Sequence, residues 1–157
     1  MNADRPPMGM LSGVRIVELG TAVTAPLAAM LLADMGASVV KVERPGGDPY
    51  RHYPGMTPQF AAANRNKDSI VCDLATEAGC EQLLQLLAGA DVFIENMRPG
   101  VMERLGFAYE DLRKDNPGLI YCSLSGFGRS GPYKHRRGFD LVAQAMSGIM
   151  TRSSTPR

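Results

Sequence analysis

The sequence predicts an α/β protein built on a parallel β-sheet with helices on both faces. Two observations carry this prediction. Short runs rich in β-branched and other apolar residues alternate with helical patterns, and the runs are apolar almost throughout rather than at every second position. Strands that are apolar on both sides are typical of a sheet covered on both faces, and the alternation with helices indicates that consecutive strands run in parallel.

Each expected element begins or ends at a recognisable signal. Pro26 suits a first helical turn and Gly36 a helix end, whereas four prolines and three glycines make residues 45–58 an irregular loop. The stripe of the third helical segment is expected to be Leu83, Leu84, Leu86 and Leu87, with Gly89 ending the helix. The expected strands are residues 14–19, 38–43, 69–73, 91–95 and 119–124, and the expected helices are 26–35, 76–88, 100–105, 109–114 and 139–150.

Composition excludes several classes of protein. The 157 residues carry 17 Lys and Arg against 16 Asp and Glu, and a net charge of +1 argues against a nucleic-acid-binding surface. No apolar run approaches the roughly 20 residues that a membrane span needs. The cysteines Cys72, Cys80 and Cys122 lack metal-binding spacing, so we expect three small core residues in a reducing cytoplasm. His52 and His135 also lack companion ligands, which argues against a metal site.

The loops after the strands are the expected binding region, because ligands of parallel sheets bind beyond the carboxyl ends of the strands. These loops span residues 20–24, 43–47, 96–100 and 125–131. Several cations lie in or near them, and they suit either a solvated surface or a clamp for the phosphates of a polyanionic ligand. They are Arg44, Arg98, Arg104, Arg129 and the basic run 134–137.

Two local patterns have a structural and a functional interpretation. Residues 126–131 match GxGxxG, but no apolar helical pattern follows them, so a loop is favoured over a dinucleotide-binding turn. Asp140 precedes an amphipathic helix, and a helix N-cap is favoured over a catalytic carboxylate. Residues alone therefore predict a parallel α/β unit with basic loops at its strand ends.

An ordered series of segments resembles the family III coenzyme A transferases, the family of formyl-CoA and carnitine-CoA transferases and of 2-methylacyl-CoA racemases. The resemblance runs from about residue 9 to residue 150. Its segments are 11–18, 33–43, 64–67, 95–100, 105–106, 116–117, 125–128, 131–132 and 138–145.

The resemblance implies a Rossmann-like parallel sheet in a large domain, a smaller second domain, and a homodimer of interlocked chains. Family members are more than twice as long, so we expect an N-terminal fragment whose fold is incomplete. Residues 1–10 are expected to be a tail, 11–150 the first part of the large domain, and 151–157 an unrelated polar tail that reflects a truncated or shifted reading frame.

The chemistry that the resemblance implies is transfer of coenzyme A from an acyl-CoA to a small carboxylic acid. An aspartate attacks the thioester, CoA thiolate leaves and returns, and an aspartyl-CoA thioester forms, with CoA as substrate rather than a permanently bound cofactor. That aspartate is expected beyond the last residue of this chain, which is therefore expected to be inactive alone. Asp140 matches an accessory acidic position.

Positions that contact CoA in the family are carried over one at a time. Arg44, Arg104 and Arg137 match basic positions for the nucleotide and phosphates. Ala75 departs from a lysine that some members carry. The remaining matches are Val23, Thr24, Cys72, Asn96 and Met97.

Two alternatives remain open at this point. A non-catalytic module that binds CoA is one. An acyl-CoA racemase relative is the other, although the racemase branch has a histidine where this chain has Phe139, a side chain that cannot exchange a proton. Neither nucleic acid nor membrane is an expected partner.

Overall fold

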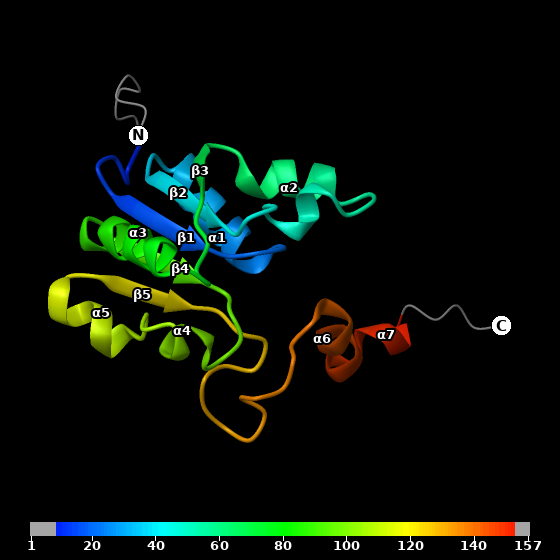
Figure 1. Cartoon of the computed structure of the whole chain (residues 1–157). Helices are drawn as coiled ribbons and strands as arrows, with labels where there is room; N and C mark the ends of the chain where they lie inside the picture. Colours follow the sequence, from blue (N-terminus) through cyan, green and yellow to red (C-terminus); the bar gives the residue numbers. More distant parts are fainter. Residues whose placement is uncertain (1–8, 153–157) are drawn as a thin grey trace. The chain divides into compact units, whose positions relative to one another are not determined.

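The computed structural model describes residues 9–152, and the chain divides after Leu124 into two units (Figure 1). The first unit ends at Leu124 and the second begins at Ser125. Each unit is described by itself below. No helix among the described residues is long and apolar enough to cross a membrane.

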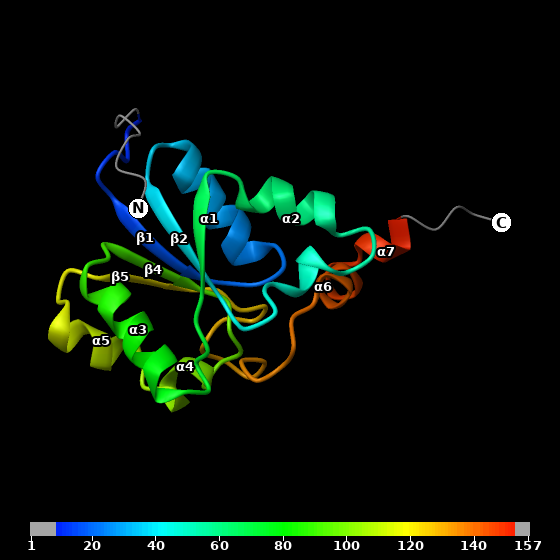
Figure 2. The ribbon, with the colours of Figure 1, turned by 45° about the horizontal axis from the view of Figure 1, so that its top comes forward.

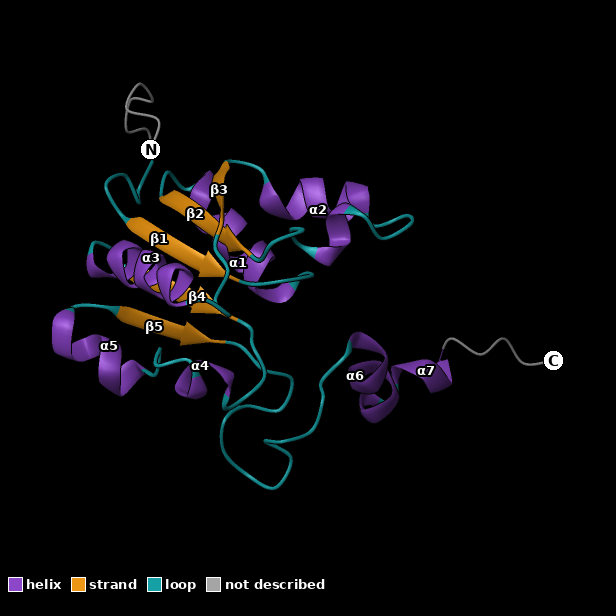
Figure 3. Cartoon of the chain, in the orientation of Figure 1, coloured by secondary structure: helices purple, strands orange, loops and turns teal. Residues whose placement is uncertain are grey.

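The first unit holds a parallel five-stranded sheet, which confirms the predicted fold class (Figure 3). The strand order is β3-β2-β1-β4-β5, so the chain starts in the middle, builds outward to β3, and then returns to the other side of β1. The strands are β1 (Arg15–Leu19), β2 (Ser38–Glu43), β3 (Lys67–Val71), β4 (Val92–Glu95) and β5 (Ile120–Ser123). The helices are α1 (Thr24–Asp34), the 3₁₀ turn η1 (Pro49–Arg51), α2 (Thr57–Asn64), α3 (Glu77–Ala88), α4 (Val101–Arg104) and α5 (Tyr109–Asp115).

Helices lie on both sides of this sheet, with α1 and α2 on one side and α3, α4 and α5 on the other (Figure 2). Ala25, Ala29 and Ala33 recur every four residues along α1, and these small buried side chains let α1 pack closely on Ile16 and Val39. The opposite face carries the larger apolar core. Its fully buried members include Phe93, Leu83, Leu87, Phe107 and Met102.

The ends of the two long helices follow from their sequence. After α1, Gly36 adopts a φ of +102°, a left-handed conformation that suits glycine at a helix end. At the start of α3, the Thr76 side chain accepts a hydrogen bond from Gly79 N at 3.1 Å. The helix then ends at Gly89, as predicted.

Three expectations within the first unit need correction. Residues 45–58 are not wholly irregular, because they contain η1 and the start of α2, where Pro58 fits the first helical turn. The helix α2 escaped the sequence pattern since Ala63 is its one fully buried residue. The third strand begins two residues earlier than predicted, at Lys67, and Leu84 of α3 is 43% exposed rather than part of the buried stripe.

The cysteines are free thiols, but they are not all core residues as predicted. Cys72 is buried, Cys80 is half-buried and Cys122 is exposed. Cys122 lies on the edge strand β5, where Ile120 of the same face is 63% exposed. No helix in the described part of the first unit covers this face of β5. Ile120 and Cys122 are therefore exposed, although the apolar pattern of the strand predicts burial.

The second unit contains α6 (Asp140–Ser147) and α7 (Ile149–Arg152) after a long stretch of turns. The predicted continuous helix over 139–150 is wrong at Gly148, which has a φ of +77° and separates α6 from α7. Thr151 and Arg152, the first residues of the predicted polar tail, belong to α7. Residues 153–157 of that tail, and residues 1–8 of the expected N-terminal tail, lie outside the described residues.

Residues 126–131 form turns and open no helix, in agreement with the predicted loop. A Cβ atom on Gly126 would lie 2.4 Å from the Cα of Gly138. The first glycine of the GxGxxG pattern therefore serves a close backbone contact with Gly138, and no dinucleotide-binding turn is formed.

Candidate functional site

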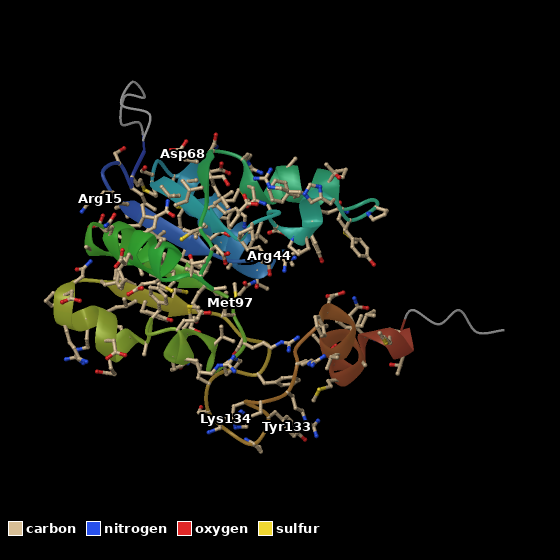
Figure 4. All side chains as sticks on the ribbon, in the orientation of Figure 1. Arg15, Arg44, Asp68, Met97, Tyr133 and Lys134 are labelled. Carbon is tan, nitrogen blue, oxygen red and sulfur yellow. The ribbon has the colours of Figure 1, made fainter. Side chains whose placement is uncertain are left out.

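The candidate site of the first unit lies at the carboxyl edge of the sheet, between β1 and β4. The order of the strands reverses there, since β2 lies on one side of β1 and β4 on the other. Loops that leave neighbouring strands at such a point diverge and leave room for a ligand. Figure 4 shows Arg44 and Met97 near this edge and Arg15 at the opposite end of the sheet.

Asn96, the residue after β4, joins the loops at this reversal point. Its Oδ1 accepts a hydrogen bond from Thr21 N at 3.0 Å, and its Nδ2 donates to Thr21 O at 2.8 Å and to Thr24 Oγ1 at 3.0 Å. The structure thus brings together two of the predicted residues, Asn96 and Thr24, by direct contact. Val23 and Met97 are their chain neighbours.

The loop between β1 and α1, residues 20–23, has a constrained backbone. Ala22 has a φ of +64°, a conformation that costs a non-glycine residue about 1 kcal/mol or more. A Cβ on Gly20 would lie 2.5 Å from the Cβ of Ala25, so a larger residue there would push the loop away from α1. We call residues 20–23 the β1–α1 loop; the loop presents Val23, which is 44% exposed, at the edge of the sheet.

Arg44 follows β2 in a tight turn, in which Gly47 N donates to Arg44 O at 2.8 Å. The base of the turn is held by the Glu43 carboxylate. It accepts hydrogen bonds from Asp48 N at 2.8 Å and from Arg51 Nε and Nη2 at 2.8 and 2.6 Å. Ser69 Oγ adds a further hydrogen bond to Glu43 at 2.6 Å. The turn is therefore fixed while the Arg44 side chain stays exposed.

The same contacts set the pKa of Glu43. Burial alone would raise it, but the hydrogen bonds from Arg51, Ser69 and Asp48 N outweigh burial and lower the pKa to about 2. Glu43 is thus a carboxylate at neutral pH and a permanent anchor of the turn.

Four buried charged side chains lie beneath the strand ends, on the face that α1 and α2 cover. We call Glu18, Lys41, Asp48 and Lys67 the ionic cluster. Glu18 accepts from Lys41 Nζ at 2.9 Å through Oε1 and from Lys67 Nζ at 2.6 Å through Oε2. Lys41 Nζ also lies 3.3 Å from Asp48 Oδ2, so two cations face two carboxylates.

The ionic cluster is almost fully shielded from water. Lys41 is 1% exposed and Glu18 is 0% exposed, which is rare for these residue types unless they are paired. Burial lowers the pKa of Lys67, and the neighbouring Glu18 carboxylate opposes that shift. Lys67 Nζ also donates to Pro26 O at 2.7 Å and to Asn64 Oδ1 at 3.0 Å, so it has three acceptors.

The predicted contact positions after β3 are of two kinds. Cys72 is buried, its thiol donates to Gly79 O at 2.8 Å, and burial raises its pKa, so the thiol does not face the edge of the sheet. Ala75 is exposed, and its N–H donates to Asp73 Oδ1 at 3.0 Å.

Met97 is the predicted contact position in the loop after β4. It is half-buried against the apolar core, and its N–H donates to the buried Glu95 carboxylate at 2.7 Å.

The predicted cations are exposed. Neither Arg44 nor Arg104, the last residue of α4, forms an ion pair among residues 9–152. Both guanidinium groups therefore keep their capacity to bind anions. Arg137 is exposed in the second unit, where the neighbouring Arg136 stacks on Tyr133 with 4.1 Å between Cζ and the ring centroid.

Asp140 is not the N-cap that the sequence favoured. Phe139 occupies the cap position, and Asp140 is the first residue of α6, where its carboxylate accepts a hydrogen bond from the Gln144 side chain. The backbone thus turns into the helix one residue earlier than the pattern indicated. Asp140 still suits the helix, because a negative charge is favourable in the first turn.

Sequence reasoning missed the ionic cluster as well as the roles of Glu43 and Arg51. A signal was present, because Glu18, Lys41 and Glu43 are charged residues inside otherwise apolar strands. The strand registers show why these residues meet. Glu18 pairs with Lys41, and Lys41 pairs with Ser69, so the polar residues share one face. No group of three or more His, Cys, Asp or Glu within residues 9–152 is arranged to hold a metal ion.

Comparisons with known proteins bear on the family and the fold of the chain. The family model described as CoA-transferase family III matches residues 11–157. The chain is 44% identical to the acetyl-CoA:oxalate CoA-transferase of Acetobacter aceti, over 96% of this chain and 40% of that protein. It is also 44% identical to the succinyl-CoA:glutarate CoA-transferase of Mus musculus, over 94% of this chain and 35% of that protein.

Solved structures give the same result. A CAIB/BAIF family protein from Brucella suis matches with a TM-score of 0.86 and 42% identity, over 90% of this chain and 40% of that one. The Rv3272 protein of Mycobacterium tuberculosis matches with a TM-score of 0.88 and 43% identity, over 96% of this chain and 43% of that one. The chain thus spans about two fifths of the length of the relatives it matches.

Proposed function

The chain belongs to CoA-transferase family III, and we propose that its first unit binds coenzyme A at the carboxyl edge of the sheet. The observation that carries the proposal is the set of hydrogen bonds that Asn96 forms with Thr21 and Thr24 at the reversal point of the strand order. They give the two flanking loops one defined arrangement at the position where such sheets bind ligands.

The chemistry of the edge fits a polyanionic ligand. Arg44 and Arg104 are exposed and make no ion pair among the described residues of the chain, and a guanidinium group binds phosphate oxygens in pairs. Val23 and Met97, in the loops that follow β1 and β4, offer apolar surface for the pantetheine chain. The other proposed contacts to CoA are Thr24, Cys72, Ala75, Asn96 and Arg137.

We infer further that the reaction served is transfer of CoA between an acyl-CoA and a small carboxylic acid, with CoA entering as a substrate. The relatives named above, an acetyl-CoA:oxalate and a succinyl-CoA:glutarate CoA-transferase, support this substrate class. Covalent transfer needs an attacking carboxylate, and the family resemblance gives Asp140 only an accessory position. We therefore assign CoA binding to this chain and propose no attacking carboxylate within it. We also propose that the protein is a homodimer, that it is cytoplasmic, and that it has neither nucleic-acid nor membrane partners.

Calorimetric titration with CoA tests the binding site. The chain is expected to bind CoA, and Arg44→Gln is expected to weaken binding about tenfold through loss of a charge-assisted contact. The matched control is Arg15→Gln, which removes the same charge at the opposite end of the sheet and is expected to leave the affinity unchanged. Absence of CoA binding by the unaltered chain, or equal losses in both variants, would contradict the proposal.

A second assay separates binding from catalysis. Binding of CoA without transfer from acetyl-CoA to an added carboxylic acid is expected, and it matches the alternative of a non-catalytic CoA-binding module for this chain alone. Measurable transfer by the chain would overturn the proposal that it binds CoA without supplying the attacking carboxylate.

A further inference from the structure

The Lys41 ammonium lies between the two loops that carry the proposed CoA contacts. Lys41 Nζ donates to Gly20 O, in the β1–α1 loop, at 2.7 Å, and to Glu18 Oε1 at 2.9 Å. The same atom lies 3.3 Å from Asp48 Oδ2, at the far side of the turn that holds Arg44. One buried cation thus contacts the segments that follow β1 and β2.

Asp48 joins Lys41 to the loop of residues 44–48 and to η1. Its Oδ1 accepts a hydrogen bond from Tyr50 N at 2.9 Å and so caps η1, while its N–H donates to Glu43 at 2.8 Å. Its other oxygen, Oδ2, is buried without a hydrogen-bond donor among the described residues and faces Lys41 Nζ. The position of η1, and with it the turn at Arg44, is therefore linked electrostatically to Lys41.

Lys67 shows what the position of Lys41 adds. Both ammonium groups bind the Glu18 carboxylate, one on each oxygen, and both are 1% exposed at the side chain. Lys67 donates its remaining hydrogen bonds to Pro26 O in α1 and Asn64 Oδ1 in α2, not to the loops that carry Arg44 or Val23. The two lysines are thus equivalent in charge and burial but different in what they connect.

We propose that Lys41 is a positioning residue for CoA binding, whose ammonium fixes the spacing between the β1–α1 loop and the loop of residues 44–48. This inference rests on the proposed function. A buried ion pair offers little net stability against an apolar core of equal volume. The contacts of Lys41 instead join the β1–α1 loop, at Gly20 O, to the loop of residues 44–48, at Asp48. Loops that are already ordered lose less conformational entropy when the ligand binds, so the affinity for the ligand is higher.

The test compares Lys41→Met with Lys67→Met, which delete the same charge from the same carboxylate. CoA affinity is measured by calorimetry at a temperature well below both unfolding transitions, so that all molecules are folded. Lys41→Met is expected to weaken CoA binding about tenfold and Lys67→Met by less than about threefold, although both lose stability. Equal affinities in the two variants would overturn the proposal, since stability alone would then explain the effect.

Asp48→Asn is a milder variant for the case in which Lys41→Met does not fold. It removes the charge that faces Lys41 and retains an oxygen that can cap η1, so an intermediate loss of affinity is expected. An affinity equal to that of the unaltered chain would contradict the role of the Lys41–Asp48 contact.

Hydrogen exchange without CoA keeps this inference separate from the proposed function. Exchange at Thr21 N, and at Tyr50 N, is expected to accelerate in Lys41→Met relative to the strand amides of β1, which report global stability. In Lys67→Met, the exchange rates of these two amides are expected to change in parallel with those of the strand amides of β1. If the unaltered chain does not bind CoA, the proposed function fails, while unchanged relative exchange in Lys41→Met would refute the positioning of the loops by Lys41.

Discussion

The two faces of the sheet in the first unit are stabilised by different chemistry. The face toward α3, α4 and α5 is an apolar core around Phe93, Leu83 and Leu87. The face toward α1 and α2 is apolar only over part of its area, around Ile16 and Val39, and towards the carboxyl edge it carries the ionic cluster.

The two kinds of chemistry have different consequences for the stability of the sheet and for the position of its loops. Apolar packing is not directional, so the apolar core itself fixes no particular loop. The exception on this face is the buried Glu95 carboxylate, which accepts a hydrogen bond from Met97 N at 2.7 Å in the loop after β4. Hydrogen bonds and ion pairs are directional, and those of the second face end on Gly20 O and Asp48, which belong to the loops of the proposed site. The polar face therefore connects the sheet to the loops after β1 and β2.

The largest expected effect comes from the centre of the ionic cluster. Glu18→Gln is nearly isosteric, but it leaves two buried ammonium groups facing an amide, and removal of one partner from a buried ion pair typically costs about 3–5 kcal/mol of unfolding free energy. Phe93→Leu, a conservative change in the apolar core, is expected to cost about 1 to 2 kcal/mol. Urea denaturation followed by circular dichroism measures both.

The comparison of the two faces would fail if Phe93→Leu proved the more destabilising change. A loss below about 1 kcal/mol for Glu18→Gln would mean that water enters the cluster and solvates the lysines. That result would also weaken the positioning role of Lys41, because a hydrated ammonium does not fix its neighbours.

Acid sensitivity is expected to come from the polar face. The pKa of Glu43 is lowered to about 2 in the folded chain from an ordinary value of 4.5, so its stabilising contribution is fully present above about pH 4.5 and is lost as the pH falls towards 2. Between about pH 4.5 and pH 2, the unfolding free energy of Glu43→Gln is expected to fall by about 1 to 3 kcal/mol less than that of the unaltered chain. Urea denaturation at pH 7, 4 and 3 measures it.

An unchanged slope in Glu43→Gln would show that Arg51 and Ser69 do not stabilise the carboxylate in solution. Ser69→Ala provides a graded control, because it removes one hydrogen bond and leaves the Arg51 ion pair in place. Its effect on the slope is expected to be smaller and of the same sign.

The predictability of the two faces differs for a physical reason. Apolar runs of β1, β2, β4 and β5 are local signals, and the strands were predicted to within about two residues. The helix α2 was missed because its burial comes from packing on α1 and η1 rather than from an apolar face of its own. The break at Gly148 was missed because a glycine within an amphipathic pattern is compatible with either a helix or a stop.

The candidate site was predictable only in part. The contact between Asn96 and Thr24 joins residues 72 positions apart and depends on β4 pairing with β1, which no local pattern encodes. The ionic cluster depends in the same way on the registers that bring Glu18, Lys41 and Ser69 side by side. The family resemblance supplied positions such as Arg44, but the contacts that hold those positions in place came from the structure.

The smallest expected effect lies at the rim of the polar face, at the ion pair of Asp34 with Arg65. Hydrogen bonds from Arg65 and Asn66 lower the pKa of Asp34, but the pair is exposed to water, and the carboxylate stands unfavourably at the C-terminal end of α1. These two effects oppose each other, so Asp34→Asn is expected to change the urea midpoint at pH 7 much less than Glu43→Gln does. Raising the salt concentration to about 1 M should remove what difference remains, because salt screens exposed charges. If Asp34→Asn matched Glu43→Gln in size, or if its effect persisted in salt, burial would not be what distinguishes the Glu43–Arg51 ion pair from an exposed one.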